Sequence, residues 1–101
     1  MACEIFLTDP ALGELRSIRV FDRRRMVSEI KIQLLHQPTV EIRDRKSLGS
    51  ATPGFEHVAP VWQLRVGDFR VFYDVSQWEQ RVYVRAVRRK APGQTTEEVI
   101  S

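Results

Sequence analysis

The stretch from Trp62 to Tyr73 constrains the fold of this chain more than any other, because it reads as a complete two-stranded hairpin. Its sequence, WQLRVGDFRVFY, places alternating segments on either side of Gly67-Asp68, a pair that is typical of two-residue β-turns. A turn at these two residues fixes the register of the pairing. Apolar pairs then share one side of the hairpin, which we expect to face the core: Val66 with Phe69, Leu64 with Val71, and Trp62 with Tyr73.

The opposite side of the same hairpin carries charge. The register places Arg65 directly opposite Arg70, and Gln63 opposite Phe72. Like charges that face each other across a ladder destabilise the pairing by up to about 1 kcal/mol. A purely structural hairpin would more readily carry Thr, Glu or a Lys–Glu pair at these positions. The two facing guanidinium groups therefore indicate a site for an anion.

Length and composition set the broad class of protein. The 101 residues, 43% of them apolar, suffice for one core, so we expect residues 1–101 to form a single domain. The single Cys3 permits no internal disulfide, and no stretch has the character of a membrane span or a secretory leader. We therefore expect a cytoplasmic protein with no metal, no cofactor and no membrane partner.

The positive charge is clustered along the chain, although the net charge is only +3. The clusters are Arg23–Arg25, the group Arg43, Arg45 and Lys46, and the segment Arg81–Lys90. Clustered cations of this kind predict a polyanion or an acidic protein as the partner.

The first half of the chain predicts one strand and two helices. Residues Cys3–Thr8 alternate as a strand, and Asp9-Pro10 supplies the N-cap and the first position of a helix that runs to about Ile18. A second helix is expected over about Asp22–Leu35. This start places Arg23–Arg25 in the first turn, where the helix dipole disfavours cations. Either the helix begins earlier, or these arginines meet an acidic partner.

The second half predicts a long loop and one further strand. Residues 39–61 show no strong period apart from a brief extended piece at Val40–Arg43, and a connection of this length is typical of functional loops. A final strand is expected at Arg81–Arg88, after the hairpin. Beyond it, Thr95-x-x-Glu98 resembles the capping box of a last helical turn.

The expected order is therefore β-α-α-β-β-β, an α+β fold in which two N-terminal helices pack on one face of a mainly antiparallel four-stranded sheet. Strict alternation in the last strand puts one set of residues on the core side: Val82, Val84 and Ala86. It puts the other set on the side of Arg65 and Arg70: Tyr83, Arg85, Val87 and Arg89. This second side is expected to be open and strongly basic.

Three segments together resemble the RelE/ParE toxin superfamily. The hairpin and its continuation, Trp62–Val75, look like the signature hairpin of that superfamily, and Val84–Lys90 resembles its last strand. The segment Arg43–Leu48 is similar to a basic segment of one subgroup. With the order of the elements, the resemblance spans about residues 3–90.

The resemblance implies a small cytoplasmic toxin of a bacterial type II toxin–antitoxin system, neutralised by an acidic antitoxin protein in a hetero-oligomer. RelE-like members cleave mRNA in the ribosomal A site without a metal, whereas ParE-like members poison DNA gyrase. By position, the phosphate-binding and catalytic basic residues of the superfamily fall on Arg65, Arg70 and Arg88–Lys90. A further catalytic lysine falls on Gln63, and the C-terminal tyrosine of the nuclease branch has no match.

The leading hypothesis is a RelE-like, ribosome-dependent mRNA endoribonuclease that inhibits translation. Metal-free RNA cleavage needs a base for the 2′-hydroxyl, cations for the phosphorane and a donor for the leaving oxygen. In this hypothesis Arg65 and Arg70 hold the scissile phosphate, while Arg89 or Lys90 assists proton transfer. The expected RNA contacts are Arg43, Arg45, Lys46, Gln63, Tyr83, Arg85 and Arg88.

His57 is a further candidate base, because an imidazole can exchange a proton near neutral pH. The alternative hypothesis is a protein that is not a nuclease: a ParE-like gyrase inhibitor, or a degenerate toxin that only binds its antitoxin. The absent lysine and tyrosine favour this alternative, whereas the pairing of Arg65 with Arg70 favours the nuclease.

Overall fold

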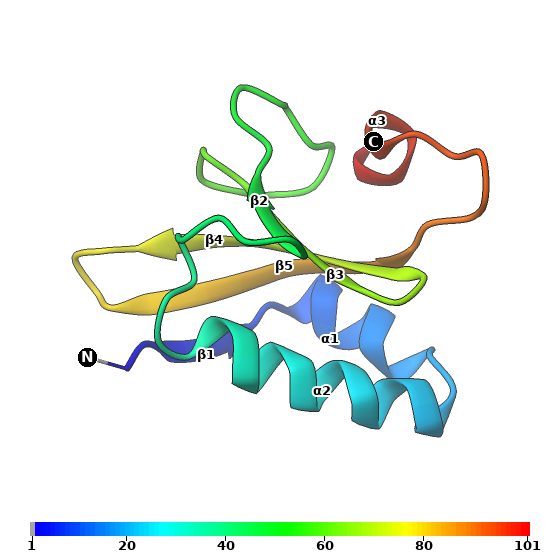
Figure 1. Ribbon diagram of the computed structural model, residues 1–101, viewed down its shortest axis with the longest axis horizontal. Coiled ribbons are helices and arrows are strands. Elements are labelled where there is room, and N and C mark those ends of the chain that lie inside the picture. The colour runs from blue at the N-terminus through cyan, green and yellow to red at the C-terminus, as the bar shows by residue number, and fades with distance from the viewer. Residues whose placement is uncertain (1) are drawn as a thin grey trace.

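The structure is a computed structural model and describes residues 2–101. Within these residues the chain forms three helices and five strands, in the order β1 (Glu4–Leu7), α1 (Asp9–Arg16), α2 (Val20–Leu34), β2 (Arg45–Ser47), β3 (Trp62–Val66), β4 (Phe69–Ser76), β5 (Arg81–Arg89) and α3 (Thr96–Ile100). The strands form one sheet in the order β1-β5-β4-β3-β2. In Figure 1, α1 and α2 lie below this sheet, whereas α3 and the loops around β2 lie above it.

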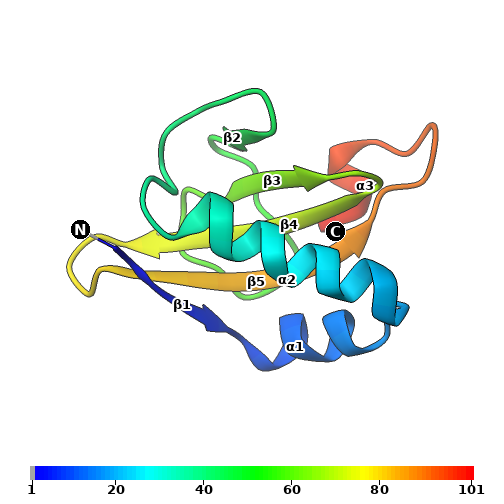
Figure 2. The same ribbon diagram turned by 60° about the horizontal axis from the view of Figure 1, so that its bottom comes forward.

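The predicted α+β class is confirmed, but the sheet has one strand more than the four expected. Strand β1 pairs parallel with β5, and the other pairings are antiparallel. The additional strand is β2, which pairs with β3. It begins at Arg45, two residues after the end of the expected extended piece at Val40–Arg43. Only Ile42 of that piece joins the ladder, through an isolated bridge to Arg45. Figure 2 shows α2 crossing the sheet obliquely.

Helix α2 begins at Val20, two residues earlier than expected. Asp22 therefore occupies the first turn, where the positive end of the helix dipole favours an acid. Arg23–Arg25 lie beyond that turn, so their position needs no acidic partner to explain it. The inward side of the helix is apolar and packs on the sheet through Met26, Ile30 and Leu34. Helix α1 ends at Arg16, two residues before the expected Ile18.

The β3–β4 hairpin has the predicted register at every position. Arg65 pairs with Arg70 and Gln63 with Phe72, while the apolar pairs face the helices. The Tyr73 hydroxyl is buried among them and donates a hydrogen bond of 2.6 Å to the Pro38 carbonyl. Burial raises the pKa of this phenol well above its ordinary value.

Strand β5 departs from the predicted alternation because it contains a bulge at Arg85. Phe72 pairs with Ala86 and Tyr73 with Val84, so Arg85 is the extra residue and the two sides exchange beyond it. The expected placement of Ala86 on the helix side and of Val87 and Arg89 on the opposite side was therefore wrong. Val87 belongs to the core beneath the helices, and Arg88 lies opposite Arg70.

The side of the sheet away from α1 and α2 is only partly open. A second, smaller core covers its middle: Val61, Phe72, Ala86, Val99 and Ile100. Helix α3 supplies the last two residues, and its start carries the predicted capping box between Thr95 and Glu98. Hydrogen bonds from Thr95 lower the pKa of the Glu98 carboxyl. The basic surface is thereby confined to one end of the sheet.

We expect Gly67→Ala to destabilise the fold. Gly67 has a φ of +57°, and an added Cβ would lie 2.9 Å from Nη1 of Arg25. The positive φ alone costs an L-residue about 1 kcal/mol. The measurement is the free energy of unfolding from urea denaturation.

Gly13→Ala is the matched control, because nothing lies within 4 Å of its added Cβ and the residue is inside α1. It should stabilise the protein by up to about 1 kcal/mol. A Gly67→Ala variant as stable as the parent chain would contradict the tight turn described above.

Candidate functional site

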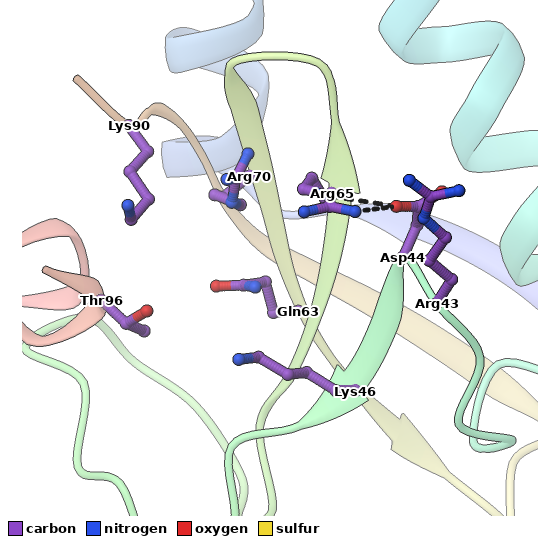
Figure 3. Close-up of a pocket in the computed structure, with 8 residues that line it drawn as sticks. All are labelled: Arg43, Asp44, Lys46, Gln63, Arg65, Arg70, Lys90 and Thr96. Carbon is purple, nitrogen blue, oxygen red and sulfur yellow. Dashed lines mark hydrogen bonds and ion pairs between the residues drawn. The ribbon is translucent and has the colours of Figure 1, made fainter. Parts of the chain in front are cut away.

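A cavity of about 270 Å³ lies on the side of the sheet that carries Arg65 and Arg70, beside α3 (Figure 3). Its lining residues, which we call the basic pocket, are Arg43, Asp44, Lys46, Gln63, Arg65, Arg70, Lys90 and Thr96. Five of these side chains are cations and one is a carboxylate. The basic pocket is therefore suited to an anionic group.

Strand pairing brings these side chains together. Lys46 is paired with Gln63 across β2 and β3, and Arg65 with Arg70 across β3 and β4, so all four share one side of the sheet. Lys90 follows β5, and its backbone N–H donates a hydrogen bond of 2.7 Å to the Asp68 carbonyl. This bond ties the end of β5 to the hairpin tip, and in Figure 3 the Lys90 side chain extends toward the pocket.

Arg65 has an acidic partner inside the basic pocket. Its Nε and Nη2 atoms lie 3.0 Å and 2.8 Å from Oδ1 of Asp44. The two side chains are 43% and 47% exposed, so water screens the pair and its contribution to stability is below about 1 kcal/mol. An incoming anion can therefore compete with Asp44 for Arg65 at little cost.

Arg70 has no carboxylate partner among the described residues. Its Nη1 donates to the backbone carbonyls of Gly67 and Phe69, each at 2.9 Å. Burial lowers the pKa of the Arg70 guanidinium below its ordinary value, and the positive charge of Arg65 lowers it further. The negative charge of a bound anion would raise this pKa again.

Six of the residues predicted for the site line the basic pocket: Arg43, Lys46, Gln63, Arg65, Arg70 and Lys90. The other five do not lie there.

Arg45 is sealed on the helix side of the sheet. It is only 5% exposed. In β2 it pairs with Leu64 and so faces the helices, whereas its neighbour Lys46 pairs with Gln63 and faces the opposite side of the sheet. Its guanidinium donates to the backbone carbonyls of Val40 and Gln33. The expectation that Arg45 joins an open RNA surface was wrong, and the residue instead holds the loop after α2 in place.

Tyr83 and Arg85 lie at the opposite end of the sheet. Arg85 forms an ion pair of 2.8 Å with the buried Asp74, and its guanidinium stacks on the Tyr83 ring at 4.8 Å. The Tyr83 hydroxyl donates to Glu79 at 2.9 Å. Tyr83 and Arg85 therefore contact other residues of the chain and do not line the basic pocket.

Arg88 and Arg89 do not line the basic pocket, although the bulge places Arg88 on the same side of the sheet as Arg70 and turns Arg89 to the other side. Arg88 bonds to Glu14 at 3.1 Å and to the Val99 carbonyl at 2.6 Å, so it fastens α3 to the sheet. Arg89 lies toward the helices, 68% exposed and 4.0 Å from Asp68. Of the expected cluster Arg88–Lys90, only Lys90 lines the basic pocket.

His57 lies in the loop before β3, where its Nδ1 is 2.8 Å from the Phe55 carbonyl, and it does not line the basic pocket. Two lining residues were missed by the sequence analysis, Asp44 and Thr96. Asp44 is flanked by basic residues on both sides, and this was the one available signal. Thr96 comes from α3, whose position over the sheet has no local signature.

No three side chains of His, Cys, Asp or Glu gather into a metal-binding group anywhere in residues 2–101. In the same part of the chain, no helix combines the length and the apolar character that crossing a membrane requires.

Comparison with known families decides the relationship of the chain. Residues 5–91 match the sequence model of a family described as the ParE toxin of type II toxin–antitoxin system, parDE. The chain belongs to the ParE toxin family. It is thus a toxin-family member of type II toxin–antitoxin systems within the RelE/ParE superfamily. No curated protein matches its sequence.

Solved structures with a similar fold include chains of RelE–RelB and RelBE complexes. A chain of the archaeal RelE–RelB complex from Pyrococcus horikoshii is 17% identical, with a TM-score of 0.69, and the match covers 92% of this ParE-family chain and all of that one. A chain of the RelBE2 toxin–antitoxin complex from Mycobacterium tuberculosis is 19% identical, with a TM-score of 0.64 and coverage of 89% and 100%. At these identities the likeness is one of fold.

We expect Asp44→Asn to strengthen anion binding in the basic pocket by several-fold. The change removes the carboxylate charge that holds Arg65 and raises the positive charge of the pocket, which attracts anions more strongly. The measurement is an NMR titration with inorganic pyrophosphate at fixed ionic strength.

Asp9→Asn is the control, since it makes the same change in net charge at the exposed start of α1. If the Asp44→Asn variant binds pyrophosphate no more tightly than the control variant does, Asp44 does not compete with the anion for Arg65.

Proposed function

We propose that this ParE-family chain is the toxin of a type II toxin–antitoxin pair and acts as a RelE-like, ribosome-dependent endoribonuclease on mRNA. The observation that carries the proposal is the facing pair Arg65 and Arg70, set in a pocket with the lysines Lys46 and Lys90. Forked guanidinium donors match phosphate oxygens, and two of them facing each other can bind one phosphate together.

The proposed reaction is attack of a ribose 2′-hydroxyl on the adjacent phosphorus. The P–O5′ bond breaks, a 2′,3′-cyclic phosphate forms, and a proton passes from the 2′-oxygen to the leaving 5′-oxygen. Arg65 and Arg70 stabilise the charge that builds up on the phosphorane. Lys90 exchanges the proton, because it is the lysine next to Arg70 at the hairpin tip. Arg89, which lies toward the helices, takes no part.

The second candidate function is inhibition of DNA gyrase without nuclease activity. The family description, which names the ParE toxin, favours it. The contacts of Arg88 also favour gyrase inhibition. Arg88 bonds to Glu14 and to the Val99 carbonyl of α3, so the pocket has fewer cations than the resemblance implies. Gln63 stands where the resemblance implies a catalytic lysine.

The proposed protein partner is an acidic antitoxin, and a toxin–antitoxin hetero-oligomer in the cytoplasm would be the resting state. Similar folds occur in solved RelE–RelB and RelBE complexes. The outer side of α2 offers a matching surface: a groove of about 450 Å³ lined by Arg23, Arg24, Val27, Ser28 and Lys31, with exposed Phe21 and Ile32 on the same helix. An acidic, partly apolar segment would fit both its charge and its exposed side chains.

Arg70→Ala should abolish growth inhibition on induced expression and leave the fold intact. The Arg70 side chain bonds only to carbonyls of its own turn, and its loss removes one of the two phosphate ligands. Removing a donor of this kind lowers a reaction rate by roughly 10²–10³-fold. Primer extension on cellular mRNA and a gyrase supercoiling assay should be run in parallel, with circular dichroism to verify folding.

Arg16→Ala is the matched control, because it removes the same charge from an exposed position at the end of α1. Cuts in phase with ribosomes that disappear in Arg70→Ala would support the nuclease. Inhibited supercoiling without mRNA cuts would support the gyrase inhibitor instead. A folded Arg70→Ala variant that remains fully toxic would rule out the basic pocket as the site of either activity.

A further inference from the structure

Gln63 is the one neutral amide in the basic pocket and the second residue of β3. Its side chain is only 7% exposed, and in Figure 3 the amide extends into the space between Lys46, Arg70 and Thr96. Its carbonyl oxygen Oε1 is buried, and no donor within residues 2–101 forms a hydrogen bond to it. The pocket thus contains cations that need an anion and an acceptor that needs a donor.

A buried acceptor without a donor is costly, because the group has lost its hydrogen bonds to water and gained none in return. In native proteins such groups are rare and commonly mark a place that a ligand or water completes. No side chain around Gln63 supplies the donor in this structure: Arg65 is held by Asp44, Arg70 by the backbone of its own turn, and none of Lys46, Lys90 and Thr96 forms a hydrogen bond to Oε1. A bound ligand can therefore supply the missing donor.

A ligand that satisfies this pocket carries an anion and a hydrogen-bond donor side by side. A ribonucleotide has this arrangement, because the 2′-hydroxyl is adjacent to the 3′-phosphate. DNA lacks the hydroxyl, and a carboxylate side chain of a protein has only acceptors, so an acidic peptide would have to supply the donor from its backbone N–H. A volume of about 270 Å³ is at the small end for ligand pockets and suits one ribose phosphate better than a complete nucleotide.

The spacing along β3 agrees with this ligand. Gln63 and Arg65 are two residues apart on the same side of the strand, which separates their Cα atoms by about 7 Å. Side chains at this spacing can converge on neighbouring groups of one nucleotide, the amide on the sugar and the guanidinium on the phosphate. Arg70 reaches the same phosphate from the facing strand.

We propose that the Gln63 carbonyl accepts a hydrogen bond from the ribose 2′-hydroxyl of a nucleotide whose 3′-phosphate is bound by Arg65 and Arg70, so that the pocket selects RNA over DNA. Gln63 is then a specificity residue. The inference rests on the proposed function for the identity of the phosphate ligand, and it adds how the sugar is recognised.

The test compares adenosine 3′-phosphate with 2′-deoxyadenosine 3′-phosphate by NMR titration of the full chain. Neither probe has a leaving group on its phosphate, so no cleavage complicates the measurement. The ribose form should bind about tenfold more tightly, as expected for one hydrogen bond to a buried acceptor. Inorganic phosphate, titrated in parallel, reports the anion site alone.

Gln63→Met keeps the length of the side chain and removes the acceptor. It should lower the affinity for the ribose form to that of the deoxy form, and leave the affinities for the deoxy form and for phosphate unchanged. Gln63→Glu keeps an acceptor and adds a negative charge, so it should weaken both nucleotides yet preserve the ratio between them. Gln77→Met, at the exposed turn after β4, should change nothing.

Thermal unfolding separates specificity from a structural role. Because the orphaned acceptor destabilises the free protein, Gln63→Met should unfold at the same temperature as the parent chain or higher. A lower unfolding temperature would show that Gln63 supports the fold and would count against the inference.

The inference is overturned if the parent chain binds both nucleotides equally, or if Gln63→Met retains the preference. If the parent chain still binds phosphate in that case and the Arg70→Ala variant does not, the anion site and the proposed function remain in place. If the parent chain binds a poly-glutamate peptide but no phosphate, the inference about Gln63 and the proposed nuclease function are both overturned. The pocket would then be a site for an acidic protein.

Discussion

The pairing of β3 with β4 is the interaction on which the rest of the structure depends. Its two-residue turn at Gly67-Asp68 sets the register, and a slip of one residue would move every side chain to the wrong side of the sheet. The apolar side explains why the unfavourable contact between Arg65 and Arg70 is tolerated. Burying each large apolar side chain contributes about 1.5–3 kcal/mol, whereas the facing cations cost up to about 1 kcal/mol.

The bulge at Arg85 is the second determinant of the site. It exchanges the sides of β5, so Ala86 and Arg88 face the same way as Phe72 and Arg70. A small apolar patch then forms where an unbroken strand would have carried another cation, and the C-terminal residues cover it. The basic surface is thus reduced from a whole sheet face to a pocket at one end, walled on one side by α3.

The elements that could be predicted from the sequence are those with a local, repeated pattern. Alternation with a Gly-Asp turn predicts the hairpin and its register, and the Thr95–Glu98 spacing predicts the final cap. Strand β2 could not be predicted, because its three residues are too few to show a period and are placed by their pairing to β3. The bulge was equally invisible, because a strand of Val and Arg reads the same with or without one extra residue.

In the site, the cations whose position follows from a strand register could be predicted from the sequence. The cations whose position depends on tertiary contacts could not. Arg45 was expected to contact RNA because it lies in a basic cluster with Arg43 and Lys46. It is buried because the backbone carbonyls at the end of α2 and in the following loop take up its donors. Asp44, between two basic residues, was passed over although its carboxylate holds Arg65.

The relation between the basic pocket and the fold explains why family membership does not decide the activity. The hairpin of this chain presents two guanidinium groups side by side, and such a pair would serve a phosphodiester and an acidic peptide equally well. What distinguishes these ligands is the neutral group between the cations. A lysine at position 63 would add positive charge and strengthen the binding of both the phosphodiester and the acidic peptide. The Gln63 carbonyl instead favours a ligand that carries a hydrogen-bond donor. The discriminating chemistry of the pocket therefore lies in its one uncharged amide rather than in its abundant positive charge.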